Sequence, residues 1–131
     1  MSTTISGKEL RVVHGTADPG TTTQTRGMIR QPGIDSNTAG AKKIWLGKVT
    51  CAPNTLGPPH HHGEAETAAY VISGSIRVYF GEDFQEYVDA GPGDFIYVPA
   101  NTPHIEGNVT GEPAEAILSR GPDNIVVNLG E

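Results

Sequence analysis

The chain has 131 residues, the usual size of one globular domain, and a formal net charge of −6. Glycine (17) and proline (10) together account for 27 residues, and because both destabilise the interior of a helix they argue against a helical bundle. The acidic balance and the lack of a run of four or more basic residues argue against nucleic acid as a partner.

The N-terminal part of the chain carries little regular pattern. Residues 1–6 contain neither a basic cluster nor an apolar core, so we expect no export signal and a cytoplasmic location. A strand is expected near 10–14, and the polar, turn-rich segment 15–26 predicts a loop. No apolar run approaches the ~18 residues that a membrane-spanning helix needs, so we expect no association with a membrane.

From about residue 42 onward, short runs of β-forming residues are separated by Gly, Pro, Asn and Asp. Bulky and polar residues alternate in 43–50 and 75–80, as half-buried strands require. Only 63–69 allows a helix as an alternative. The pattern predicts an all-β protein, either a sandwich or a closed barrel. The expected strands lie near 10–14, 27–31, 42–51, 58–62, 67–73, 75–80, 85–89, 94–98, 103–108, 114–119 and 124–129.

The expected strands also suggest where several side chains lie: buried, at the surface or in a turn. The only cysteine, Cys51, excludes an intramolecular disulfide and a four-cysteine zinc site, and we expect it to be buried. Arg30 and Arg77 could hold a substrate anion, but we expect both at the solvated surface. Asn108 is expected to brace a turn. Four aromatic residues are expected in the core or in a pocket wall: Trp45, Tyr70, Phe95 and Tyr97.

Four of the five histidines lie in two places, His60–His62 and His104. On a strand, His60 and His62 project to the same face while His61 points away, and two imidazoles on one face can bind one divalent ion. A third ligand must come from another strand, and His104 is the candidate. The alternatives are a solvated histidine run without function and a hydrogen-bonded, structural His104. His14 stands alone, and a surface or core role suits it better than ligation.

The residues around these histidines resemble the cupin superfamily. The first cupin motif is matched by His60-x-His62 and Gly74. The second motif is matched by a set of residues with the family's spacing, apart from one replaced glycine: Gly93, Pro99, Asn101 (in place of that glycine), His104 and Asn108. The resemblance covers roughly residues 45–120 and implies a double-stranded β-helix (cupin or jelly-roll barrel) with a metal inside. It implies a single cupin domain over 1–131, with 1–40 an N-terminal strand/loop extension and 41–120 the barrel that bears the motifs.

The sequence departs from the family pattern at the acidic ligand. Counted back from Gly74, the position of the family's glutamate is Thr67, whereas Glu66 lies one residue earlier. A slip of one residue turns a strand side chain to the opposite face, so Glu66 could ligate only through a bulge. We therefore favour a site of three histidines, with Thr67 beside the metal as a hydrogen-bonding group, and keep Glu66 as the alternative ligand.

Three histidines leave coordination positions open, as a catalytic metal requires. Such a site suits one divalent transition metal, with iron favoured and zinc, nickel, manganese or copper as alternatives. Glu106 lies two residues from His104 and could act as a general base, although we expect it to be solvated at the rim.

Three functions are considered for such a site. We favour the first, a dioxygenase-type oxidoreductase that acts on a small organic substrate. The second is a non-redox isomerase, cyclase or lyase, and the third is a barrel that binds a small ligand without turnover. The family resemblance also suggests a homodimer, to which the expected strand near 27–31 could contribute.

Overall fold

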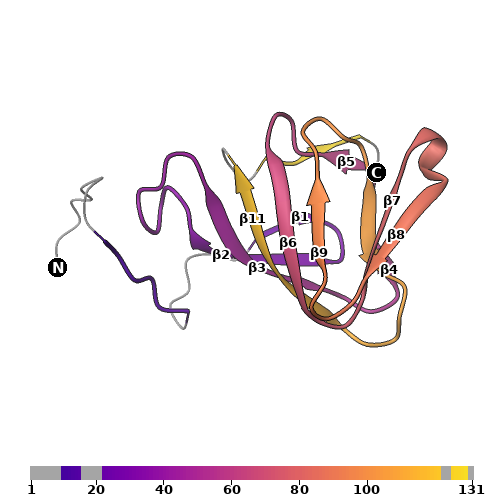
Figure 1. The fold of residues 1–131 in the computed structure, drawn as a ribbon, viewed down its shortest axis with the longest axis horizontal. Coiled ribbons are helices and arrows are strands. Elements are labelled where there is room, and N and C mark those ends of the chain that lie inside the picture. The colour runs from indigo at the N-terminus through magenta and orange to yellow at the C-terminus, as the bar shows by residue number, and fades with distance from the viewer. Residues whose placement is uncertain (1–9, 16–21, 122–124, 130–131) are drawn as a thin grey trace.

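The fold is shown in Figure 1, a computed structural model that describes residues 10–15, 22–121 and 125–129. As predicted, the protein is all-β, with one short 3-10 turn, η1 (Glu82–Phe84). No helix in these ranges is long and apolar enough to cross a membrane. The strands are β1 (Thr22–Thr25), β2 (Met28–Ile34), β3 (Trp45–Cys51), β4 (Thr55–Leu56), β5 (His60–His61), β6 (Glu66–Ser73), β7 (Ile76–Phe80), β8 (Glu86–Ala90), β9 (Phe95–Val98), β10 (Ile105–Asn108), β11 (Ala114–Gly121) and β12 (Val127–Asn128).

The strands form two main antiparallel sheets that pack against each other. The larger sheet has the order β1-β2-β3-β11-β6-β9, and the smaller has the order β4-β10-β7-β8. A third, two-stranded sheet pairs β12 with β5 near one end of the sandwich (Figure 1). Strands that are neighbours in a sheet are mostly distant in sequence, so the motif segments are brought together only by the complete fold.

Alternation along the strands places the core between the two sheets. In β11 every second residue is buried, from Ala114 to Arg120, and β3 buries Trp45, Val49 and Cys51 in the same way. The smaller sheet contributes Ile76, among others, to the same apolar cluster. Burial of Trp45 and Cys51 confirms the assignments made from the sequence. Because side chains alternate strictly, polar residues with inward parity also enter the barrel interior.

Two turns explain residues of the recognised motifs. Gly74 has a φ of +76°, and a Cβ atom there would lie 2.5 Å from the Pro113 carbonyl oxygen, so the position requires glycine. Asn108 braces the connection from β10 to β11: its amide donates to the Glu112 carbonyl (2.5 Å), and its Oδ1 accepts from the Thr110 backbone N–H (2.9 Å). This confirms the turn role expected for Asn108.

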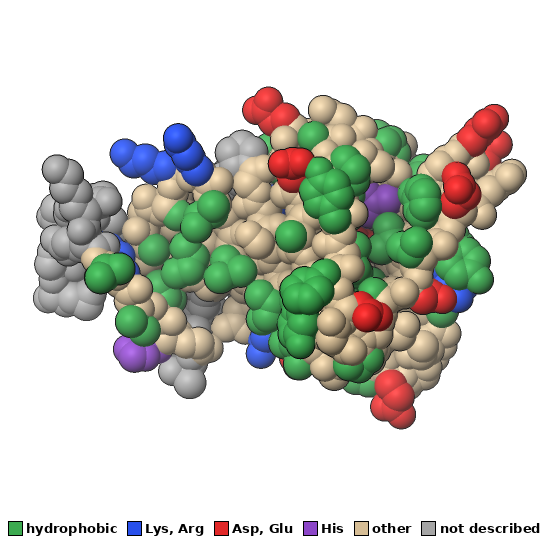
Figure 2. All heavy atoms as spheres, viewed as in Figure 1, with side chains coloured by type: hydrophobic (Ala, Val, Ile, Leu, Met, Phe, Trp, Pro, Cys, Tyr) green, Lys and Arg blue, Asp and Glu red, His purple; other side chains and the backbone are tan. Residues whose placement is uncertain are grey.

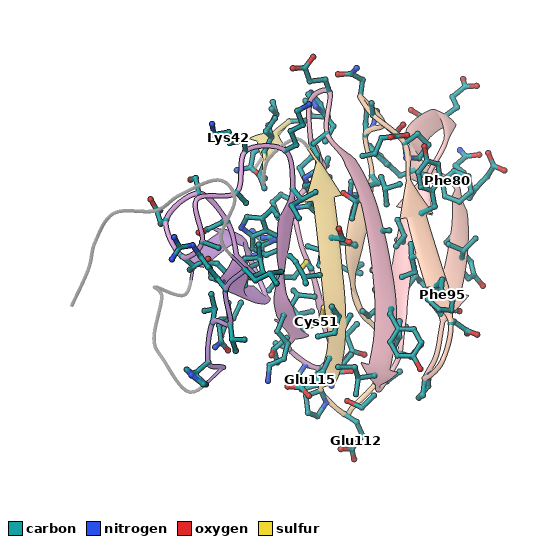
Figure 3. All side chains as sticks on the ribbon, turned by 60° about the vertical axis from the view of Figure 1, so that its left-hand side comes forward. Lys42, Cys51, Phe80, Phe95, Glu112 and Glu115 are labelled. Atoms are coloured by element: carbon teal, nitrogen blue, oxygen red, sulfur yellow. The ribbon has the colours of Figure 1, made fainter. Side chains whose placement is uncertain are left out.

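Glu112 and Glu115 lie at one end of the sandwich and Lys42 at the other (Figure 3).

The structure corrects several expected elements. Residues 10–14 form no strand, whereas β1 and β4 are strands that the sequence did not predict. β1 lies within the expected loop 15–26, of which residues 16–21 fall outside the described ranges. Its sequence is entirely polar, so it lacks the apolar alternation that identifies a half-buried strand. The helical alternative for 63–69 is wrong, because β6 begins at Glu66. Residue 124 of the last expected strand also lies outside the described ranges.

Three of the four aromatic residues are not in the core. Tyr70, Phe95 and Tyr97 lie on the outer face of β6 and β9 and are exposed, with 79% of Phe95 accessible to solvent. Tyr70 and Phe95 pack on each other at 4.9 Å between ring centroids. Figure 2 shows hydrophobic side chains spread over the face that the larger sheet presents. The expectation of core positions was wrong because β9 turns Ile96 and Val98 towards the core, which leaves Phe95 and Tyr97 on the outer face.

Candidate metal centre

Two backbone hydrogen bonds bring the separate histidine segments together. The His60 N–H donates to the His104 carbonyl (3.0 Å), and the His104 N–H donates to the His60 carbonyl (2.9 Å). His60 and His62 share the inner face, as the strand geometry predicted, whereas His61 is half-buried on the other side. The three inner histidines are 0%, 2% and 1% exposed for His60, His62 and His104.

The inner imidazole rings converge on one point. The ring centroids are 4.9 Å apart for His60 and His62, 4.4 Å for His60 and His104, and 5.1 Å for His62 and His104. With the carboxylate of Glu106, these side chains offer four ligand atoms that all lie within 4.8 Å of one another. Four donors at such separations can contact a common ion.

Hydrogen bonding fixes which nitrogen of each ring is available. Each Nδ1 lies within hydrogen-bond distance of a backbone carbonyl oxygen, which requires that Nδ1 carries the proton. The three Nε2 atoms are buried and have no hydrogen-bond partner among the described residues. Buried nitrogen lone pairs without a partner are unfavourable, and a metal ion would satisfy all three, so these residues fit a divalent transition metal. The carbonyl partners are Pro58 for His60 (3.1 Å), Ile125 for His62 (2.6 Å) and Thr102 for His104 (2.9 Å).

Glu106 extends from β10 into the same cluster. Its Oε1 lies 3.3 Å from Nε2 of His60 and 3.7 Å from Nε2 of His104, and only 12% of its side chain is exposed. The expectation of a solvated rim position was therefore wrong: β10 continues through Glu106 and keeps the inward parity that it shares with His104. Burial works to raise the pKa of Glu106, but His104 and His60, when they carry a proton on Nε2, outweigh burial and hold that pKa well below its usual range. A metal ion at the same Nε2 atoms would supply positive charge in place of those protons. Glu106 is thus a carboxylate at neutral pH.

The His62 imidazole is uncharged at neutral pH. Burial, followed by the positive charge of Arg120, lowers the pKa of His62 to about 3. Metal ligation requires neutral imidazole, so His62 is prepared to act as a ligand without releasing a proton.

The structure separates the two candidates for the acidic ligand position. Thr67 lies on the inner face of β6 and is buried, and its hydroxyl accepts a 2.7 Å hydrogen bond from Nε of Arg120. Glu66 lies on the outer face, where its exposed carboxylate accepts a hydrogen bond from the Tyr97 hydroxyl. No bulge turns Glu66 inward, so the cluster consists of three histidines and Glu106.

Two arginines enter the barrel interior. Arg30 on β2 is 0% exposed and Arg120 on β11 is 2% exposed, so the expectation of a surface position for Arg30 was wrong. Nη2 of Arg30 lies 3.9 Å from Oε1 of Glu106. Strand parity could have identified Arg30, since it shares the inner face with Met28, but Ile29 made both faces of this strand look apolar. Arg77, in contrast, projects from the outer face of β7 and forms a two-point pair with Asp89.

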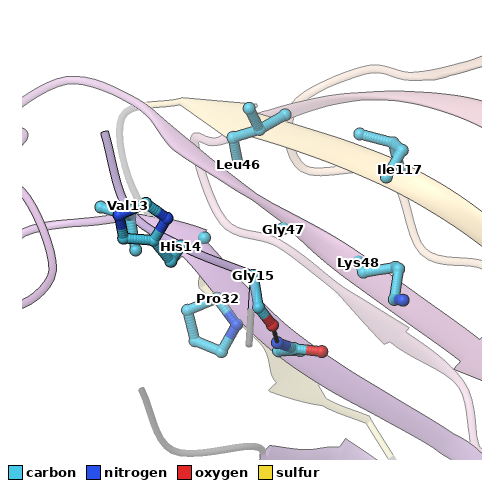
Figure 4. Close-up of a pocket in the computed structure, with 10 residues that line it drawn as sticks. Val13, His14, Gly15, Pro32, Leu46, Gly47, Lys48 and Ile117 are labelled. Carbon is cyan, nitrogen blue, oxygen red and sulfur yellow. Dashed lines mark hydrogen bonds between the residues drawn. The ribbon is translucent and has the colours of Figure 1, made fainter. Parts of the chain in front are cut away.

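His14 is not part of this cluster. It is exposed and lines a hollow of about 230 Å³ on the outer face of β2 and β3, together with Pro32 and Leu46 (Figure 4). The side-chain amide of Gln31 donates to the Gly15 carbonyl (3.2 Å) across this hollow. The surface alternative for His14 is thereby confirmed.

Comparison with known proteins gives matches to one family. The sequence profile described as "Cupin domain" matches residues 47–119. A germin-like protein, subfamily T member 3, from Arabidopsis thaliana is 34% identical over 105 residues, which are 79% of this chain and 44% of that protein. The chain spans half the length or less of the plant relatives that it matches.

Solved structures agree with this assignment. The polyketide cyclase RemF from Streptomyces resistomycificus superposes with a TM-score of 0.75 at 25% identity, over 94% of this chain and 87% of that one. Oxalate decarboxylase from Bacillus subtilis, a protein with Mn(II) centres, superposes with a TM-score of 0.66 at 26% identity, over 81% of this chain and 29% of that one.

Proposed function

The chain belongs to the cupin family, and we propose from this premise that it is a metal-dependent enzyme acting on a small organic substrate. His60, His62 and His104 hold one divalent transition metal, and Glu106 acts beside it. The observation that carries the proposal is the set of three buried Nε2 atoms that converge without a hydrogen-bond partner in the part of the chain that the structure describes.

Each residue of the cluster has a separate task in this proposal. The metal ion, when bound, supplies a positive charge that polarises a substrate oxygen. Glu106 is ionised and lies next to the ligand atoms, so it can take a proton from the substrate at Oε1 and return it later. The barrel walls, with histidines at most 2% exposed, keep water away from that proton transfer.

We infer a non-redox reaction, of the isomerase, cyclase or lyase class, as the first candidate. The specific support is the likeness to the polyketide cyclase, which extends over nearly the whole of both chains. In this reaction Glu106 removes a proton from a carbon next to a carbonyl, and the carbonyl oxygen takes up the negative charge beside the metal position. One buried carboxylate and one cation are sufficient for such chemistry.

A dioxygenase-type oxidoreductase is the second candidate. Its support is the donor set, because three imidazoles and one carboxylate suit redox-active iron or manganese as well as zinc. The likeness at 26% identity to a decarboxylase with Mn(II) centres agrees with that donor chemistry.

The first experiment measures the metal content of the purified protein and of two variants. We expect about one equivalent of a divalent metal in the wild type, its loss in His104→Ala, and its retention in His61→Ala, because His61 lies outside the cluster. Equal metal content in the wild type and His104→Ala would contradict the proposal. Oxygen uptake with a β-diketone, measured on iron-loaded protein, then separates the candidates: uptake favours the dioxygenase, and turnover without uptake favours the non-redox enzyme.

A further inference from the structure

Arg30 is a buried cation whose hydrogen-bonding capacity is unused. Its guanidinium is 0% exposed, and Nε, Nη1 and Nη2 all lack a hydrogen-bond partner in the described part of the chain. Oε1 of Glu106 lies 3.9 Å from Nη2 of Arg30, which is too far for a hydrogen bond. A buried guanidinium with unused donors is unfavourable unless an acceptor binds there.

The positive charge of Arg30 is balanced only in part. Arg30 is 0% exposed, and its Nη2 lies 3.9 Å from Oε1 of Glu106, a carboxylate oxygen that also approaches Nε2 of His60 and of His104. A divalent metal ion at the histidines would add further positive charge beside Glu106. In an interior that water hardly reaches, such a cation favours the binding of an anion.

The position of Arg30 relative to the metal ligands defines what that anion can be. Oε1 of Glu106 is within 3.9 Å of Arg30, 3.3 Å of His60 and 3.7 Å of His104, so one small group can span the arginine and the metal position. Guanidinium presents paired N–H donors that match the two oxygens of a carboxylate or the oxygens of an enolised dicarbonyl.

We propose that Arg30 binds an oxyanion of the substrate beside the metal position, so that the substrate is an organic acid or an acidic enol. This inference rests on the proposed function, since it assigns the substrate class of the same site. Arg30 acts as a specificity-determining residue: a neutral analogue of the same shape leaves its donors without an acceptor. Arg120 differs, because its Nε already donates to Thr67.

The test uses malonate as the probe and malonamide as its neutral analogue, with binding measured calorimetrically on zinc-loaded and metal-free protein. We expect the wild type to bind malonate at least ten times more tightly than malonamide. Arg30→Met should lose at least tenfold in malonate affinity while keeping its metal, and Arg77→Met should bind as the wild type, since Arg77 is paired with Asp89 on an outer face. Comparable affinities of the wild type for the two probes would overturn the inference, and so would unchanged malonate binding by Arg30→Met.

The outcomes separate this inference from the proposed function. If the protein holds no metal but metal-free wild type still prefers malonate, the metal enzyme fails and the anion site stands. If metal binds and the preference is absent, the anion site fails alone. Because the probe comparison on the wild type needs no variant, a failure of Arg30→Met to fold leaves the test decisive.

Discussion

The hydroxyl of Thr67 accepts a 2.7 Å hydrogen bond from Nε of Arg120, and both side chains are buried in the barrel. The two residues are direct partners in the register of β6 and β11. Arg120 in turn lowers the pKa of His62, after the larger effect of burial. We expected Thr67 to lie beside the metal as a hydrogen-bonding group, and its hydrogen bond makes it a positioning residue for the Arg120 cation beside the histidine cluster.

Replacing Thr67 by valine should destabilise the protein. The change removes the acceptor of a buried, charged donor at nearly constant side-chain volume, which costs about 1–3 kcal/mol of the free energy of unfolding. Thr67→Ser keeps the hydroxyl and should lose much less. Urea unfolding of the three proteins measures the difference, and a Thr67→Val variant as stable as the wild type would show that the hydrogen bond contributes nothing.

Replacing Glu106 by glutamine should impair catalysis. The amide cannot accept a proton, and we expect kcat to fall by roughly 10² to 10⁴ with the first substrate that the wild type converts. Glu66→Gln is the matched control, because Glu66 lies on the outer face, and it should keep both its metal and its activity. Metal content and kcat are measured together, and full activity of Glu106→Gln would remove Glu106 from the mechanism.

The buried thiol of Cys51 should give the protein a specific sensitivity to alkaline pH. Burial, aided by the negative charge of Glu106 and opposed by Arg30, raises the pKa of Cys51 from 9.0 to about 12. Between these values the unfolded chain releases the thiol proton and the folded protein keeps it, so the free energy of unfolding should fall as the pH rises from about 9 to about 12.

Comparison with Cys51→Val isolates this contribution, because the other titrating groups are common to both proteins. The decline in stability above pH 9 should be less steep in the variant. The native thiol should also react slowly with a thiol reagent at pH 8, since it is 1% exposed. Parallel stability curves for the two proteins would contradict the assignment.

The expectation of a homodimer now has a candidate surface. Phe95 and Tyr97 are 79% and 62% exposed on β9, the edge strand of the larger sheet, and Tyr70 packs beside Phe95. We propose that a second copy covers this apolar face. Light scattering should give twice the mass of one chain, and Phe95→Asp should shift it towards one chain. Val88→Asp, on the smaller sheet, should leave the dimer intact. A monomeric wild type would contradict the proposed dimer.

The metal centre could largely be predicted from the sequence because strand parity is local. Residues two positions apart on a strand share a face, which predicted that His60 and His62 lie together and that His104 and Glu106 lie together. What the sequence could not decide was whether β10 continued as far as Glu106, since that depends on its pairing with Arg77, Val78 and Tyr79 in β7.

Other features depended on contacts that no local pattern encodes. β4 is only two residues long and is a strand because it pairs with β10. Arg30 looked like a surface residue because arginine usually is one. Ile29 made both faces of β2 look apolar, so the pairing of β2 with β3 was needed to show which face is inside. The outer position of Phe95 has the same origin, because β9 joins β6 with its aromatic side chains turned away from the core.

The Nδ1 contacts of the three ligands all end on main-chain oxygens. The carbonyls belong to Pro58, Thr102 and Ile125, and the side chains of these residues play no part in orienting the imidazoles. These residues can therefore be exchanged without rotating a ligand, provided that the path of the chain is kept. These three supporting positions are thereby tolerant of substitution, and the backbone sets the orientation of the ligands. Among related chains, we expect the histidines to persist while their supporting positions drift freely.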